Sequence, residues 1–132
     1  MKRPDLSEVR AVLLDLDGTV YRGSEPIPGA SEAVKRLLSA GFAVRYLTNN
    51  SAARPDQITN KLTGMGIPCE PGWVAGTGPA AAAMARSQGF RLAHIVGEPG
   101  LWESFREVGI VPSDAEPQPL LVTGICRTFD YQ

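Results

Sequence analysis

The sequence has little histidine or cysteine and no run of one charge, and each shortage excludes a class of function. His94 is the single histidine, which argues against a zinc site and against a histidine-based catalytic triad. Cys69 and Cys126 lie far apart in no metal-binding spacing, so both are expected to be reduced thiols. Thirteen basic and fourteen acidic side chains give a net charge of −1 without a basic stretch, so we expect no nucleic-acid partner.

Long apolar runs are also absent. No stretch approaches the roughly 20 apolar residues of a membrane span, and residues 1–5 lack the apolar segment of a signal peptide. We therefore expect no membrane partner and a cytoplasmic location. What is present, 43% hydrophobic and 20% charged residues, is typical of a globular protein.

Residues 12–20 carry the strongest functional signal. They form an apolar stretch that runs into Asp15 and Asp17. Because alternate side chains of a strand share a face, the two carboxylates would project together, with Cα atoms roughly 6.6 Å apart if the strand continues. At about 5 Å and an effective dielectric near ~20, their repulsion is about 3 kcal/mol. Such a pair favours a bound cation, or a division of roles between nucleophile and acid/base.

The residues that follow Asp15 predict a phosphate site. Gly18 lets the backbone turn sharply, and the backbone N–H groups from Leu16 onward can converge on an anion held before Asp15. An acidic turn at a strand end would need neither two aspartates on one face nor a wholly apolar approach.

Strands and helices alternate along the whole chain. Continuous apolar stretches predict strands, and apolar residues three or four positions apart predict helices. The expected strands are 9–14, 42–47, 73–75, 93–96 and 120–125, and the expected helices are 30–40, 55–66, 80–87 and 101–108. This order predicts an α/β fold, a Rossmann-like parallel sheet with helices on both faces and its site at the carboxyl ends of the strands. Thr48 would then reach the same edge as Asp15, whereas Trp102 and Phe105 are expected in the core.

Two segments resemble a known family. Residues 15–21 (DLDGTVY) and 47–51 (LTNNS) resemble the first and second motifs of the haloacid dehalogenase superfamily of phosphohydrolases. Residues 21–23 (YRG), 27–30 (IPGA) and the doubled asparagine are most similar to its NagD-like branch, which includes nitrophenyl phosphatases and phosphoglycolate phosphatases.

The resemblance implies a phosphatase that acts on a small phosphorylated metabolite and assigns roles to the residues of both motifs. Asp15 would be the nucleophile that forms an aspartyl-phosphate, and Asp17 the acid/base. Mg²⁺ would bind to the Asp15 carboxylate and the Asp17 backbone carbonyl. Thr48, together with Asn49 and Asn50, would bind the phosphoryl group, as would the backbone at Leu16 and Gly18.

Two elements of the family pattern are not found after residue 51. The pattern has a downstream lysine and then a Gly-Asp acidic motif, but Lys61 lies in a segment typical of an ordinary amphipathic helix. Asp114 and Asp130 lack the preceding glycine and apolar strand. We therefore expect the N-terminal part of a longer enzyme, with residues 1–90 in the catalytic core and 91–132 in the first part of an inserted α/β cap. Such a chain should bind Mg²⁺ weakly and turn over slowly or not at all, and its open sheet edge should favour homo-oligomers.

Two other functions fit parts of the sequence. Residues 76–81 match G-x-G-x-x-A after a short strand, with Glu98 near the position expected to bind a ribose, which suggests a dinucleotide-binding domain. Against this, Pro79 removes an N–H from the helix start where a pyrophosphate would bind. A phosphate-accepting module without catalysis is the other alternative, because an aspartate on a parallel sheet can accept phosphate without hydrolysing metabolites.

Overall fold

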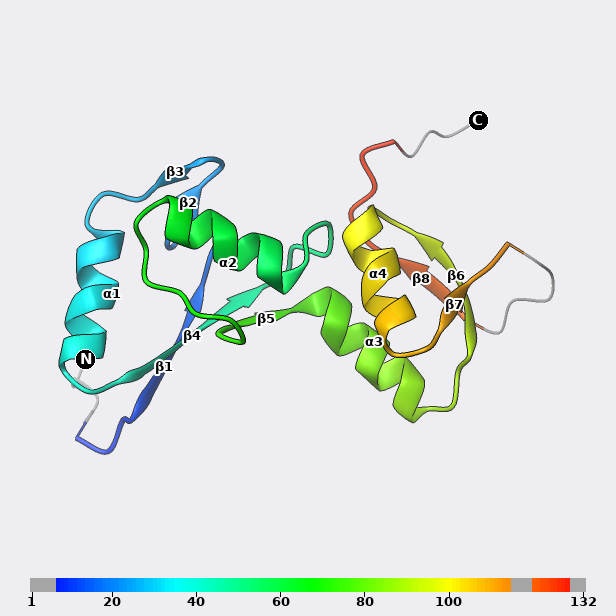
Figure 1. Ribbon diagram of the computed structural model, residues 1–132, viewed down its shortest axis with the longest axis horizontal. Helices are drawn as coiled ribbons and strands as arrows, with labels where there is room; N and C mark the ends of the chain where they lie inside the picture. Colours follow the sequence, from blue (N-terminus) through cyan, green and yellow to red (C-terminus); the bar gives the residue numbers. More distant parts are fainter. Residues whose placement is uncertain (1–6, 115–119, 129–132) are drawn as a thin grey trace, which may run out of the picture.

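The computed structural model describes residues 7–114 and 120–128, which form two lobes side by side (Figure 1). The first lobe contains a parallel sheet in the order β1-β4-β5. Its strands are β1 (Ala11–Asp15), β4 (Ala43–Thr48) and β5 (Val74–Gly76). Asp15 pairs with Leu47, and Thr48 pairs with Gly76, so the carboxyl ends of all three strands meet at one edge.

The side chains of β4 show that one face of the sheet is covered. Val44, Tyr46 and Thr48 are buried, whereas the residues between them are exposed, as the alternation of a strand requires. Two helices accompany the sheet, α1 (Ala30–Ser39) and α2 (Pro55–Gly64). The proline that begins α2 suits the first helical position, where no N–H partner is needed.

The second lobe has its own parallel sheet, in the order β7-β6-β8. Its elements are α3 (Thr77–Ser87), β6 (Leu92–Val96), α4 (Pro99–Glu107), β7 (Val111–Pro112) and β8 (Leu121–Thr123). The helices α3 and α4 pack on each other, and β5 of the first lobe runs directly into α3 (Figure 1). Phe105 and Ile110 are fully buried at the centre of this lobe.

The expected α/β fold with parallel sheets is confirmed, with shifted boundaries. The largest shift is in α3, which begins at Thr77 rather than at Ala80. Gly76 is the residue before the helix, and Pro79 lies in the first turn, where a missing N–H leaves no bond unmade. The glycines therefore belong to the start of the helix and not to a turn before it.

Short strands were missed by the sequence analysis. A hairpin joins β2 (Tyr21–Arg22) to β3 (Glu25–Pro26), and β7 is equally short. Gly23, at φ 59, occupies the first position of the two-residue turn, where a positive φ favours glycine. Two residues are too few to form a continuous apolar stretch, so the pattern that predicts longer strands gives no signal here.

The expectations for single buried residues are confirmed in part. Phe105 lies in the core as expected, but Trp102 is 40% exposed, which corrects its assignment to the core. Cys69 and Cys126 are free thiols, and burial raises the pKa of Cys69. The His94 side chain lies near the surface, with Nδ1 3.1 Å from Asp114 Oδ1.

The apolar residues form two separate cores. The first core runs from Leu16 to Val74 and the second from Ala82 to Ile110. The cores therefore divide before residue 90, and the assignment of residues 1–90 and 91–132 to a catalytic core and a partial cap remains a proposal. No helix within residues 7–114 and 120–128 has the length and apolarity needed to cross a bilayer.

Candidate active site

Asp15 and Thr48 lie at the carboxyl ends of neighbouring strands. Asp15 ends β1 and is exposed, and Thr48 ends β4 with 6% of its surface exposed. Together with Asn49 and Thr77, they border a hollow of about 420 Å³, called the Asp15 hollow below. The structure therefore brings three of the sequence-predicted residues to one place.

Asp17 lies outside the residues that line this hollow. β1 ends at Asp15, so the strand does not continue to Asp17 as the same-face argument assumed. The backbone turns instead, because the N–H groups of Val20 and Tyr21 both donate to the Leu16 carbonyl, at 2.9 and 3.2 Å. The Asp17 carboxylate instead lies near the Tyr21 hydroxyl.

The turn also defines what Leu16 and Gly18 do in this structure. The Leu16 side chain is fully buried in the first core. Gly18 has φ 82, and its N–H donates to the Tyr21 carbonyl at 2.8 Å. Gly18 thus permits a left-handed backbone turn, and a contact from either residue to a phosphate remains a prediction.

The residues after Thr48 form a short hydrogen-bonded loop. The Asn50 N–H donates to Thr48 Oγ1 at 3.1 Å, and the Ala52 N–H donates to Asn50 Oδ1 at 2.9 Å. A hydroxyl carries one donor and two acceptor lone pairs, so the Thr48 hydroxyl can accept this bond and still donate to an anion. The Asn50 side chain shapes the loop, and the residue is not among those that line the Asp15 hollow.

Two threonines at the site were missed by the sequence analysis. Thr19 Oγ1 donates to Asp15 Oδ2 at 3.4 Å, and Thr77 Oγ1 donates to the Asn49 carbonyl at 3.2 Å. Thr77 begins α3, so the first turn of this helix borders the Asp15 hollow. A helix start carries a partial positive charge that favours a bound anion. The signal for Thr77 is a strand that runs directly into a helix. The sequence analysis missed this signal because it placed the start of the helix at Ala80 and not at Thr77.

Tyr21 connects Asp17 to α2. The Tyr21 side chain is almost fully buried, and burial raises its pKa, with the nearby Asp17 carboxylate adding to the shift. Lys61 Nζ lies 3.7 Å from the centroid of the Tyr21 ring. Lys61 is therefore in contact with the turn that holds Asp17, and is not only a residue of an amphipathic helix.

The aspartates offer part of a metal-ion ligand set. Carboxylate and carbonyl oxygens are the ligands that Mg²⁺ prefers, and this ion usually keeps several waters and binds through one or two carboxylates. In the described part of the chain, no group of three or more His, Cys, Asp or Glu residues gathers in a way that could hold a metal ion. Binding of a hydrated Mg²⁺ ion by Asp15 and Asp17 therefore remains a prediction.

The segment that matches a dinucleotide-binding motif forms the start of α3 in the structure. Residues 76–81 form the residue before α3 and its first turn, in which Pro79 supplies no N–H. Glu98, the expected ribose ligand, instead accepts a hydrogen bond from the Arg127 N–H at 2.8 Å. Among the described residues, no contact of this segment or of Glu98 supports a dinucleotide site.

Comparison with known proteins matches the chain to one family of hydrolases. A family model described as haloacid dehalogenase-like hydrolase matches residues 12–111. The 5'-nucleotidase YutF of Bacillus subtilis (strain 168) is 33% identical over 124 residues, which are 93% of this chain and 48% of the relative. The chain spans about half the length of the curated relatives it matches.

Solved structures also match over most of the chain. A putative nagD protein superposes with a TM-score of 0.86 and 27% identity, covering 96% of this chain and 50% of that one. The glycerol phosphate phosphatase Rv1692 from Mycobacterium tuberculosis, solved in complex with magnesium, superposes with a TM-score of 0.79 and 28% identity. That match covers 94% of this chain and 38% of the phosphatase.

Proposed function

The chain belongs to the haloacid dehalogenase-like hydrolases, and we propose that the protein containing it is a Mg²⁺-dependent phosphatase of small phosphate monoesters. The observation that carries this proposal is the Asp15 hollow, in which an exposed carboxylate, the Thr48 hydroxyl and the start of α3 converge. A carboxylate nucleophile beside anion-binding donors is what phosphoryl transfer through a covalent intermediate requires.

The first half of the proposed reaction uses Asp15 and Asp17. An Asp15 carboxylate oxygen attacks phosphorus, the bond from phosphorus to the ester oxygen breaks, and Asp17 gives a proton to the departing oxygen. The Thr19 hydroxyl orients the Asp15 carboxylate through its hydrogen bond. Because Asp17 does not line the hollow in this structure, its side chain has to turn toward the hollow for this step.

The second half releases phosphate. Asp17, now a carboxylate, takes a proton from water as the water oxygen attacks phosphorus, and the bond from phosphorus to Asp15 breaks to give inorganic phosphate. The Thr48 hydroxyl and the start of α3 stabilise the charge on the phosphoryl oxygens, with the Asn49 and Asn50 side chains as further donors. Bound Mg²⁺, held by Asp15 and Asp17, would neutralise charge between the anionic nucleophile and the anionic substrate.

Small phosphorylated metabolites are the proposed substrates. The relatives are named as a 5'-nucleotidase and a glycerol phosphate phosphatase, and both names describe cleavage of small monoesters. A hollow of about 420 Å³ has the size of sites for small molecules.

The first prediction concerns Asp15 and tests this function in the full-length protein that contains the chain. Asp15→Asn removes the nucleophile, so we expect Mg²⁺-dependent phosphate release from p-nitrophenyl phosphate to fall by about 10⁴-fold or more. Asp17→Asn should cost about 10² to 10⁴-fold, the usual contribution of acid–base catalysis. Glu25→Gln, which neutralises an exposed carboxylate on β3, is the control and should leave the rate unchanged. Undiminished phosphate release from Asp15→Asn would overturn the proposal.

A further inference from the structure

The segment that follows Thr48, residues 49–54, passes between the two lobes and is called the junction loop here (Figure 1). Its backbone lies in close contact with the second lobe. A Cβ atom placed on Gly100, at the start of α4, would lie 2.6 Å from the Ala52 carbonyl oxygen. A Cβ atom on Gly124 would lie 2.7 Å from Ser51 Oγ. Glycine alone permits both approaches, so the second lobe packs tightly against the junction loop at two points.

A hydrogen bond connects the lobes at the same place. The Ile125 N–H, just after β8, donates to Ser51 Oγ at 3.0 Å. Ser51 follows Asn50 directly, so this contact lies next to the residues expected to bind phosphate.

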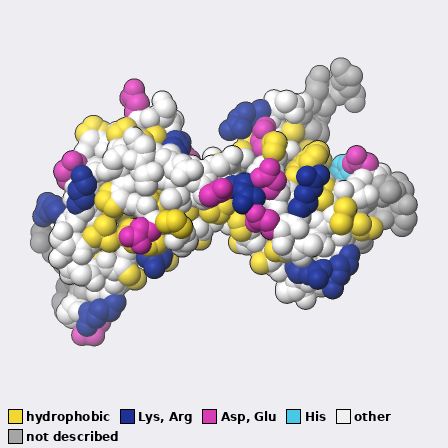
Figure 2. All heavy atoms as spheres, in the orientation of Figure 1, with side chains coloured by type: hydrophobic (Ala, Val, Ile, Leu, Met, Phe, Trp, Pro, Cys, Tyr) yellow, Lys and Arg dark blue, Asp and Glu magenta, His cyan; other side chains and the backbone are white. Residues whose placement is uncertain are grey.

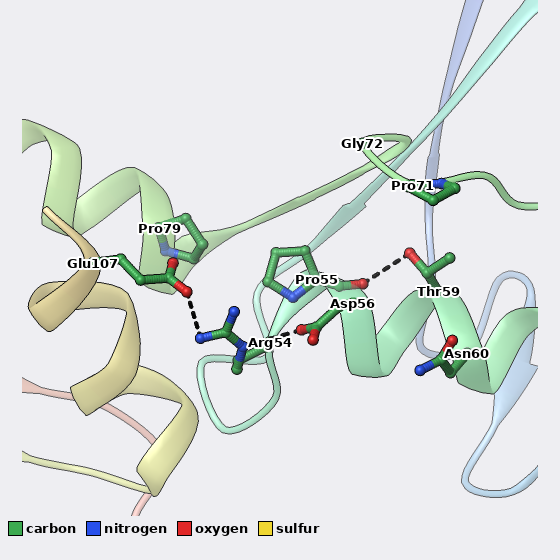
Figure 3. Close-up of a pocket in the computed structure, with 9 residues that line it drawn as sticks. All are labelled: Arg54, Pro55, Asp56, Thr59, Asn60, Pro71, Gly72, Pro79 and Glu107. Atoms are coloured by element: carbon green, nitrogen blue, oxygen red, sulfur yellow. Dashed lines mark hydrogen bonds and ion pairs between the residues drawn. The ribbon is translucent and has the colours of Figure 1, made fainter.

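Arg54 ends the junction loop and makes the charged contacts between the lobes. Its Nε donates to Asp56 Oδ1 at 3.1 Å, within the first lobe. Its Nη1 lies 3.3 Å from Glu103 Oε2 and 2.5 Å from Glu107 Oε1, both on α4. Figure 3 shows Arg54 between Asp56 and Glu107 at the edge of a groove of about 430 Å³. Figure 2 shows acidic and basic side chains gathered at the narrow junction of the lobes.

The opposite charges at this junction stabilise one another. The hydrogen bonds that Arg54 donates to Glu107 and then to Asp56 raise the pKa of Arg54, and the bond from Arg54 lowers the pKa of Asp56. The Arg54 side chain is 27% exposed, so it is partly enclosed by its surroundings. A planar group with five donors can bind several carboxylates at once, which a lysine cannot do in the same geometry.

Arginine is otherwise a poor choice for its position in α2. Arg54 is the residue before the first helical turn, where serine, threonine, aspartate and asparagine are preferred because they accept a backbone N–H. The Arg54 side chain makes no such bond, although its own N–H donates to Gln57 Oε1 at 2.9 Å. The side chain is therefore used for contacts with α4 and not for capping its own helix.

We propose that Arg54 is a positioning residue for the phosphate-binding part of the junction loop, and that it acts by tying the end of this loop to Glu103 and Glu107. The sheet fixes the other end of the loop at Thr48. Between the two ends, the Asn50 and Ala52 N–H groups bond to Thr48 and Asn50 within the loop. Releasing Arg54 would free the loop to move, and Asn49 and Asn50 would lose their fixed positions. Only the role of the loop in catalysis rests on the proposed function.

The second prediction tests this geometry by amide hydrogen exchange on the described chain. Arg54→Met keeps an unbranched side chain, replaces the guanidinium group by an uncharged end and removes both ion pairs with α4. We expect the Asn50 and Ala52 N–H groups to exchange at least about tenfold faster, because their bonds open more often. Arg10→Met is the matched control, since the Arg10 ion pair with Glu8 stays within the first lobe. It should leave the exchange of both amides unchanged.

Two further variants keep the test decisive if Arg54→Met alters the whole fold. Glu107→Gln breaks one ion pair at the surface of α4 and should speed the exchange of the same amides to a smaller extent. Gly100→Ala forces the Ala52 backbone to shift and should change the chemical shifts of the Asn50 and Ala52 amides. Unchanged exchange at these amides in folded Arg54→Met, or in Glu107→Gln if the first variant does not fold, would overturn the proposal.

Kinetics then separate this proposal from the proposed function. In an active protein, Arg54→Met should lower kcat about tenfold with a smaller change in KM, and Arg54→Lys should restore part of the loss. If exchange responds but Asp15→Asn does not affect phosphate release, the function fails and the positioning role of Arg54 stands. If Asp15→Asn abolishes phosphate release while Arg54→Met changes neither the amide exchange nor kcat, the proposed function stands and the positioning role of Arg54 fails.

Discussion

Tyr46 shows how one residue couples the first core to the solvent pH. Its ring is fully buried, and its hydroxyl donates to the Pro68 carbonyl at 2.6 Å. Burial raises the pKa of Tyr46 to about 12, with the Cys69 thiol adding to the shift. In the unfolded chain the pKa is near ~10, so folding holds the proton more tightly.

The third prediction, at this scale, is a loss of stability in alkali that depends on Tyr46. Between about pH 10 and pH 12 the unfolded chain releases the phenolic proton while the folded chain keeps it. The unfolded state then binds fewer protons, so the free energy of unfolding falls as pH rises, and Tyr46 contributes no slope below about pH 9. Urea unfolding at intervals from pH 8 to pH 11.5 would measure this.

Tyr46→Phe isolates that effect from the other groups that titrate in alkali. The variant should lose about 1 kcal/mol at neutral pH, because the Pro68 carbonyl loses its donor. Above pH 10 its free energy of unfolding should fall less steeply than that of the original chain. Two parallel curves across the whole range would contradict this account.

At the residue scale, the sequence predicted where the residues at the ends of strands lie. Asp15 and Thr48 end two neighbouring parallel strands, so their meeting at the hollow follows from the strand pattern. Thr77 could not be found in this way, because its place depends on where α3 begins. The two partners of Arg54 on α4, Glu103 and Glu107, lie 49 or more residues further along the chain, and no local pattern indicates such a contact.

At the element scale, the turn after β1 depends on one glycine. Gly18 has φ 82, in the left-handed region, and a Cβ atom there would meet nothing within 4 Å. The cost of a side chain is therefore conformational and not steric. The fourth prediction is that Gly18→Ala lowers the free energy of unfolding by about 1–2 kcal/mol, and Gly18→Asn by less, because asparagine tolerates this region better.

Gly64→Ala is the control for Gly18→Ala. Gly64 is the last residue of α2, and a Cβ atom there also meets nothing within 4 Å, but its φ is not positive. Alanine favours a helix over glycine by up to about 1 kcal/mol, so this variant should be neutral or stabilising. Denaturation midpoints of the three variants would test the contrast. Equal effects of Gly18→Ala and Gly64→Ala would show that the turn does not require a left-handed residue.

The elements themselves were predictable to different degrees. Four helices follow from apolar residues three or four positions apart, and the longer strands from continuous apolar stretches, as α1 and β4 show. The hairpin of β2 and β3 has no such period, because each strand contains two residues. Its formation depends on Gly23 and on the turn at Leu16 that brings Tyr21 beside Asp17, and these are features of turns and not of strand patterns.

At the scale of the whole molecule, β1 leaves one side of its sheet without a partner. In residues 7–114 and 120–128, β1 lies at the edge of the sheet and pairs with β4 alone. Leu13 on β1 is 62% exposed, and Leu47 on β4 is also exposed. An unpaired strand edge beside exposed apolar side chains favours association with another chain.

The fifth prediction is that the described chain self-associates through this edge. Leu13→Lys should raise the dissociation constant about tenfold or more, because it removes apolar contact and adds a charge to the sheet. Leu121→Lys, at a residue 65% exposed on β8 of the second lobe, is the matched comparison. Sedimentation velocity over a range of protein concentrations would report the effect. A chain that stays monomeric, or one dispersed by Leu121→Lys alone, would contradict the prediction.

The separation of the two cores has a consequence for how the chain is made in the cell. Every buried apolar residue of the first core lies between positions 16 and 74, and every one of the second core lies between 82 and 110. A ribosome synthesises the chain from its N-terminus, so the first core is complete before most of the second has been translated. Folding can therefore proceed in the order of synthesis, because β1, β4 and β5 leave the ribosome before α4 does.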